Sequence, residues 1–131
     1  RPSIMSTIKA NTLLHSDGTT TTQPSIPALD TRMAKAWCNL DMRGTSGIRD
    51  SFGISSVTDI GTGQFRFTLS TAMPNANYAA VGSTSRSGQT GNYHRGYDMF
   101  IESTSQVRVI TWDSGTSTTD HEVVSMAVFS S

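Results

Sequence analysis

Gln64-Phe65-Arg66-Phe67-Thr68-Leu69 is the stretch of this chain that decides its fold class. Three apolar side chains alternate with polar ones, the pattern of a β-strand with one buried face and one face in water. The preceding Asp59-Ile60-Gly61-Thr62-Gly63 contains two glycines that can adopt a positive φ, so we expect a hairpin there. The centre of the chain therefore predicts antiparallel β-structure.

A second stretch, Gln106–Trp112, departs from this alternation. Val107 and Val109 would lie on one face of a strand, while Ile110 and Trp112 would lie on the other. A strand with two apolar faces either occupies the centre of a small domain or contacts another subunit. The sequence leaves both alternatives open.

Short runs of this kind follow one another from Arg32 onward, separated by Gly, Asn and Asp. We expect strands at Met33–Leu40, Ile48–Ile54, Ser55–Asp59, Gln64–Ser70, Tyr78–Thr84, Tyr97–Ser103, Gln106–Asp113 and Glu122–Ser130. This spacing predicts an all-β fold, a small antiparallel β-sandwich or jelly-roll-like domain over residues 32–131. Residues 1–31 are dominated by Ser, Thr and Pro and predict an extended N-terminal arm or shaft segment.

Composition limits both the partners and the size of the core. Ten Lys and Arg balance ten Asp and Glu, and this argues against a nucleic-acid partner because phosphate binding normally requires a basic excess. We expect no membrane span, since no apolar run is long enough to cross a bilayer. Leu, Ile, Val and Phe number only 25 of 131 residues, so the core of one chain is thin. We therefore expect an oligomer in which subunits complete the burial.

The single cysteine, Cys38, cannot form an intrachain disulfide. Alternation places it on the same strand face as Ala36 and Leu40, which predicts a buried structural thiol.

Four separate blocks of sequence between residues 35 and 82 together form a recognisable series. They are Lys35-Ala36-Trp37-Cys38-Asn39-Leu40, then GIRDSFGISSVTD at 47–59, then GTGQFRFT at 61–68, and then AMPNANY at 72–78. This series resembles the distal, C-terminal domain of tailed-bacteriophage tail fibres. Cys38, Leu40 and Gly53 stand where that family usually has Val, Phe and Asn, which are changes that conserve size or turn chemistry.

The resemblance implies a homotrimer at the tip of a virion tail fibre, joined by its N-terminal part to other tail proteins. It also implies attachment to a bacterial surface glycan or outer-membrane receptor. The alternative is a trimeric capsid decoration or cement protein, whose N-terminal arm would bind capsid subunits.

Five aromatic residues are predicted to form the structural core: Trp37, Phe52, Phe65, Phe67 and Trp112. Trp37 and Phe52 lie in strands that otherwise hold small residues, so we expect them to fix the two sheets against each other.

The candidate receptor-binding residues lie in Ser83–Asp98, which is too polar and too rich in Gly for a core strand. They are Arg86, Tyr93, His94, Arg95 and Tyr97. Cations and amphipathic rings together suit sugar rings, carboxylates or phosphates. A second loop, Asp113–Glu122, carries three acidic residues, and the two loops could form a subunit contact or two sides of one groove.

Catalytic and metal-binding motifs are missing from the sequence. Gly44-Thr45-Ser46-Gly47 lacks the spacing of a hydrolase nucleophile motif, and the three histidines are scattered. Asp120 and Glu122 lack the ligand ladder of a calcium loop, which favours a solvated hairpin tip. We therefore expect a non-enzymatic protein without metal or cofactor.

Overall fold

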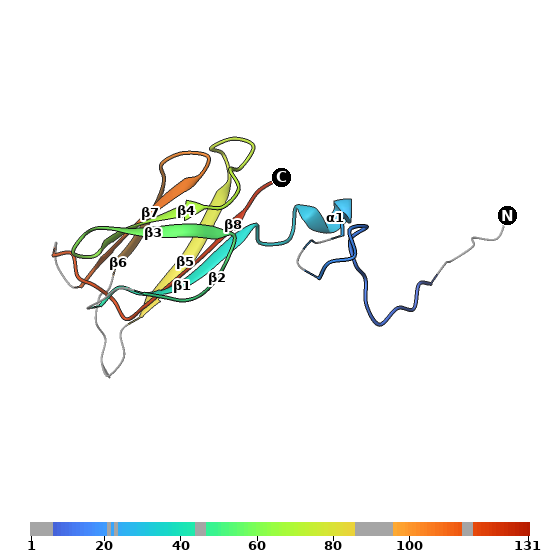
Figure 1. The fold of residues 1–131 in the computed structure, drawn as a ribbon. Helices are drawn as coiled ribbons and strands as arrows, with labels where there is room; N and C mark the ends of the chain where they lie inside the picture. The colour runs from blue at the N-terminus through green and yellow to red at the C-terminus, as the bar shows by residue number, and fades with distance from the viewer. Residues whose placement is uncertain (1–6, 21, 23, 44–46, 86–95, 114–116) are drawn as a thin grey trace.

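The computed structural model describes residues 7–20, 22, 24–43, 47–85, 96–113 and 117–131. Eight strands in these residues form two four-stranded antiparallel sheets that pack face to face (Figure 1). The elements are α1 (Pro27–Asp30), β1 (Ala36–Asp41), β2 (Gly47–Phe52), β3 (Ile54–Gly61), β4 (Gln64–Leu69), β5 (Ala79–Ser85), β6 (Gly96–Ile101), β7 (Gln106–Trp112) and β8 (Val123–Phe129). The predicted β-sandwich is confirmed.

The strand order defines two sheets, β2-β1-β8-β5 and β3-β4-β7-β6, called below the β1 sheet and the β4 sheet. Each of the eight expected strands is found with its ends shifted by at most a few residues. The largest difference is at the first strand, which begins at Ala36 rather than at Met33. Met33 instead donates its backbone N–H to Leu29 O at 3.1 Å, which continues the turn that follows α1.

β4 and β7 form the centre of the β4 sheet. Phe65 and Phe67 of β4 are buried, as predicted, and β4 pairs with β3 through the expected hairpin. β7 lies between β4 and β6, with Val107 and Val109 facing the core. β7 is therefore a central strand of its sheet, which is one of the two alternatives that its two apolar faces left open.

The core lies between the two sheets and follows the period of two along each strand. In β1 the buried residues are Ala36, Cys38 and Leu40, as the alternation predicted. Burial raises the pKa of the Cys38 thiol to about 11, and the nearby charge of Asp50 acts in the same direction.

The prediction that Trp37 and Phe52 belong to the core is wrong. Trp37 is 37% exposed and Phe52 is 54% exposed. The same alternation that buries Cys38 turns Trp37 to the outer face of the β1 sheet, where it pairs with Phe52 across β1 and β2. Register, not hydrophobicity, therefore decides the side on which these two side chains lie.

Trp112 also lies outside the core, although it is partly buried. It follows the buried Thr111 on β7 and so faces away from the opposite sheet. Its indole covers Gly96, the residue directly opposite on β6, where a Cβ would come within 1.5 Å of the ring. Only glycine leaves room there for this contact.

Gly53 marks the point where the chain passes from the β1 sheet to the β4 sheet, between β2 and β3. Its φ is +68°, and a Cβ at this residue would lie 2.8 Å from Lys35 O. The predicted strands on either side of this point therefore belong to different sheets.

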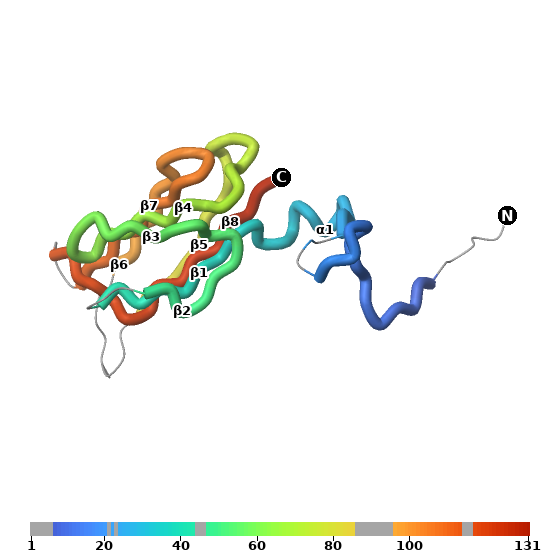
Figure 2. Tube along the Cα trace, viewed as in Figure 1, coloured from blue at the N-terminus to red at the C-terminus, as the bar shows by residue number. Residues whose placement is uncertain are grey.

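The described residues before Lys35 contain one regular element, the single turn α1, which begins with Pro27 and buries no side chain. Figures 1 and 2 show this segment to one side of the sandwich. The chain joins the β1 sheet at Lys35, whose N–H donates to Val128 O at 2.7 Å.

Candidate functional site

The two ends of the sandwich differ in what they carry. At one end, here the stem end, lie Lys35, Gly53 and Ser130, where the chain enters β1, changes sheets and leaves β8. At the other, here the loop end, β1, β3, β5 and β7 end and β2, β4, β6 and β8 begin. Successive strands run in opposite directions and their number is even, so the chain enters and leaves the sandwich at the same end.

The strands that border the predicted receptor-binding loop, β5 and β6, end and begin at the loop end. The loop's candidate residues Arg86, Tyr93, His94 and Arg95 lie outside the described residues. The strand ends that border the predicted loops are adjacent, because Ser85 pairs with Val123 and Gly96 pairs with Trp112. The structure therefore brings together the bases of the two loops that the sequence analysis singled out.

Tyr97, the fifth candidate, does not lie on the binding surface. It faces inward from β6, packs over Gly82 of the opposite sheet, and donates its hydroxyl to Ser125 O at 3.3 Å. This burial raises the pKa of Tyr97 well above its usual range. Its placement contradicts the predicted receptor contact: the ring fills the space between β5 and β6.

The segment Asp113–Glu122 was expected to be a solvated hairpin tip, and its described part is instead tied to the sandwich. Gly63 N–H donates to Asp120 Oδ1 at 2.6 Å, and the Thr111 hydroxyl donates to Thr119 O at 2.6 Å. These contacts anchor the C-terminal half of the segment beside the β3–β4 turn.

His121 is fully buried at the loop end, and no feature of the sequence predicts this burial. Its Nδ1 lies 2.6 Å from Thr84 Oγ1, and its Nε2 lies 3.3 Å from Asp113 Oδ1. The ring thus links the last residues of β5 to both sides of the β7–β8 connection. No periodic signal marks His121, because it lies before β8, where the strand alternation has not begun.

A network of ion pairs borders the loop end on the β1 sheet. Arg43 Nη2 lies 2.9 Å from Glu122 Oε1, and Arg49 Nη2 lies 2.8 Å from Asp41 Oδ2. Partial burial alone would raise the pKa of Asp41, but hydrogen bonds from Arg43 and the charges of both arginines lower it. These four charges therefore balance one another within the chain.

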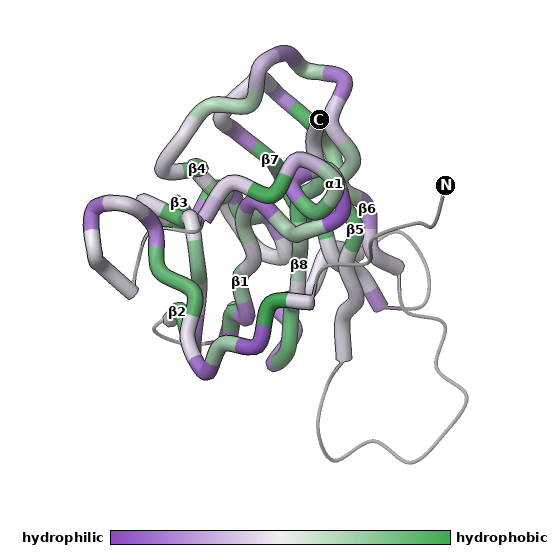
Figure 3. Tube along the Cα trace, turned by 90° about the vertical axis from the view of Figure 1, so that its right-hand side faces the viewer, coloured by the Kyte–Doolittle hydropathy of each residue, from purple (hydrophilic) through white to green (hydrophobic). Residues whose placement is uncertain are grey.

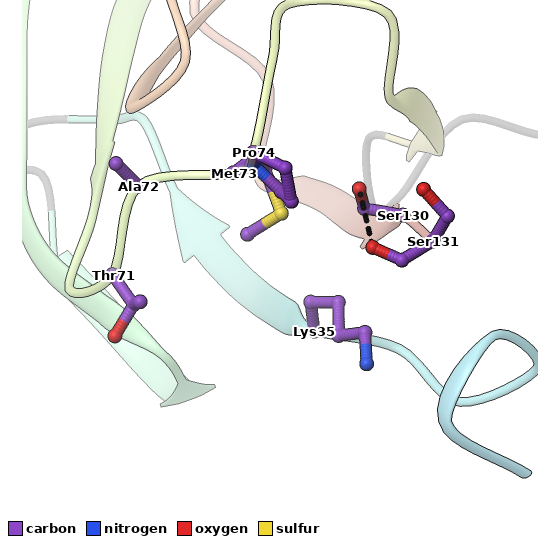
Figure 4. A pocket seen from close by; sticks show the side chains of 7 residues that line it. All are labelled: Lys35, Thr71, Ala72, Met73, Pro74, Ser130 and Ser131. Atoms are coloured by element: carbon purple, nitrogen blue, oxygen red, sulfur yellow. Dashed lines mark hydrogen bonds between the residues drawn. The ribbon is translucent and has the colours of Figure 1, made fainter. Parts of the chain in front are cut away.

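A pocket of about 280 Å³ lies at the stem end of the sandwich (Figure 4). It is lined by Lys35, Thr71, Ala72, Met73, Pro74, Ser130 and Ser131. Its lining combines hydroxyl, thioether and one ammonium group, and its position separates it from the loop end.

Among the residues with described positions, no three His, Cys, Asp or Glu side chains gather into a group that could hold a metal ion. The helical structure described for this chain includes nothing long and apolar enough to cross a membrane. Comparison with protein-family models, curated proteins and solved structures gives no match for this chain.

Proposed function

We propose that this protein is the tip of a bacteriophage tail fibre and attaches the virion to a glycan or outer-membrane component of a bacterial surface. The observation that carries the proposal is the separation of the two ends of the sandwich. The chain enters and leaves at the stem end, while the strands that border the two predicted loops, β5, β6, β7 and β8, end or begin at the loop end. A shaft at one end would then present the loops at the other.

The blocks that resemble tail fibres also agree with this architecture. GIRDSFGISSVTD at 47–59 contains Gly53, whose positive φ allows the crossing between sheets, and GTGQFRFT at 61–68 contains the β3–β4 turn and most of the central strand β4. The motif residues thus have an architectural role in the sandwich.

The proposal includes a homotrimer. Its support is the small core together with large apolar side chains in water, such as Trp37, Phe52 and Val81. Three copies of each loop on one tip would convert weak contacts with a repetitive surface into avidity.

Adsorption of the purified, labelled protein to a panel of bacterial cells and to a glycan array tests the proposed attachment. The double variant Tyr93→Ala/Arg95→Ala should bind cells at least tenfold more weakly while its melting temperature is unchanged, because loss of about 1.4 kcal/mol lowers affinity tenfold. Arg32→Ala is the matched control, since Arg32 is exposed and lies outside the sandwich.

One outcome would overturn the proposed binding loop, and another would overturn the proposed place on the tail fibre. Unchanged binding by a correctly folded double variant would remove this loop from the site and direct attention to Asp113–Glu122. Antibody labelling of virions on the capsid rather than on the tail would favour the decoration protein instead.

A further inference from the structure

The outer face of the β1 sheet carries one continuous row of apolar side chains. The strand register places Phe52, Trp37, Ala127 and Val81 side by side across β2, β1, β8 and β5. Phe52, Trp37 and Val81 are 54%, 37% and 53% exposed. This apolar row therefore crosses every strand of the sheet and faces water in the single chain.

Polarity changes along this face from the stem end to the loop end. Ala79 and Phe129 pair beside the apolar row on its stem side. On its loop side the next row contains only polar side chains, those of Asp50, Asn39, Ser125 and Ser83. Figure 3 shows the molecule from the stem end, with hydrophobic positions in green. The apolar half of the face is thus the half nearest to Lys35, where the N-terminal segment joins.

The carboxylates that the register places on this face, those of Asp50 and Asp41, lie on the loop side of the apolar row. The ion pairs among Asp41, Arg43, Arg49 and Glu122 lie toward the loop end and are formed within one chain. The apolar row itself carries no charge. A second copy of the chain presents an equally uncharged row, so the two surfaces match in electrostatic character.

The extent of the row fits the centre of a subunit contact. Phe52, Trp37 and Val81 each leave more than a third of their surface in water, and contiguous exposed apolar side chains of this kind mark interaction sites. A stable contact buries roughly 800 Å² on each partner, with an apolar centre and a polar rim. The polar row supplies such a rim on the side toward the loops.

We propose that copies of this chain associate through the outer face of the β1 sheet, with the apolar row at the centre of the contact. The inference rests on the proposed function in one respect: a shaft that holds several chains together at Lys35 would raise the local concentration of the adjacent apolar rows. It goes beyond that function by assigning the contact to one face of one sheet.

The test compares matched pairs of substitutions on the two outer faces. Phe52→Ser/Val81→Ser removes two exposed apolar side chains from the apolar row. The control, Phe100→Ser/Ile60→Ser, removes two side chains of the β4 sheet that are 42% and 39% exposed. Sedimentation velocity and light scattering should show an oligomer for the wild type and the control. The dissociation constant of the first variant should rise at least tenfold, and circular dichroism should report an unchanged fold. If that variant does not fold, Val81→Lys on the edge strand β5 replaces it.

Equal oligomerisation of both double variants, or equal weakening of both, would overturn the assignment to this face and leave the proposed trimer in place. A monomeric wild type that still adsorbs to cells would overturn the assignment and the trimer but not the proposed attachment. An oligomer that dissociates on substitution of the apolar row yet fails to adsorb would support the assignment and contradict the proposed attachment.

Discussion

At the scale of single residues, exposure separates aromatic side chains that look equivalent in the sequence. Phe67 has no exposed surface, whereas Phe100 on the same sheet is 42% exposed and lies 5.6 Å from the guanidinium of Arg108, measured to the ring centroid. Phe67→Ala should therefore lower the free energy of unfolding by about 3–5 kcal/mol through lost burial and a cavity. Phe100→Ala should lower it by less than about 1 kcal/mol.

Urea unfolding of the two variants, each compared with the wild type at the same protein concentration, measures this difference. Equal losses of stability would contradict the assignment of Phe67 to the core and Phe100 to the surface.

Cys38 gives a prediction about alkaline pH. Its pKa is about 11 in the folded chain against an ordinary value of 9.0, so between these values the unfolded chain has lost a proton that the folded chain retains. Stability due to this group is then fully present below pH 9 and falls as pH rises toward 11. Burial of Tyr78 and Tyr97 raises the pKa of each and acts in the same direction at still higher pH.

Chemical denaturation at a series of pH values should show this decline in the wild type and a shallower one in Cys38→Ala. Parallel curves for the two proteins above pH 9 would exclude a contribution from the thiol.

At the scale of elements, Glu102 joins three strands on the outer face of the β4 sheet. Arg66 of β4 and Arg108 of β7 are direct neighbours in the register, and both form ion pairs with Glu102, which follows β6. The hydrogen bond from Arg66 lowers the pKa of Glu102 against the effect of partial burial. The carboxylate thereby offsets the repulsion between two arginines on adjacent strands.

Glu102→Gln should lower the melting temperature by a small amount, and added salt should reduce the difference from the wild type because these side chains are partly in water. The contribution of Glu102 should be present at neutral pH and disappear as the pH falls through its lowered folded-state pKa. A difference that persists at high salt would instead indicate that the hydrogen bonds from Arg66 to both carboxylate oxygens stabilise the fold independently of long-range charge, because Gln has nearly the same shape as Glu.

At the scale of the whole molecule, the sandwich should fold without the N-terminal segment. α1 buries no side chain, and Lys35 forms a backbone hydrogen bond with β8. Deletion of residues 1–31 should leave the cooperative melting transition of the sandwich in place, with a midpoint close to that of the full chain. Loss of cooperative melting would show that these residues belong to the folded unit rather than to an arm.

The sequence by itself determined the eight strands, the sandwich, the burial of Phe65, Phe67 and Cys38, and the β3–β4 hairpin. These features depend on the period of two along a strand and on turn residues, both of which are local properties of the chain. It also singled out two loops whose bases the structure brings together, although four of the five candidate residues lie outside the described residues.

Only the tertiary structure decided which face of each strand the second sheet covers. Where both faces of a strand carry apolar side chains, as in β1, alternation does not say which face is inside. Trp37 and Phe52 lie outside, while Tyr97, expected at the surface, fills the space between the sheets. His121 is likewise buried through contacts with residues distant along the chain. The physical reason is that burial depends on pairing between distant strands, which hydrophobicity at one position does not encode.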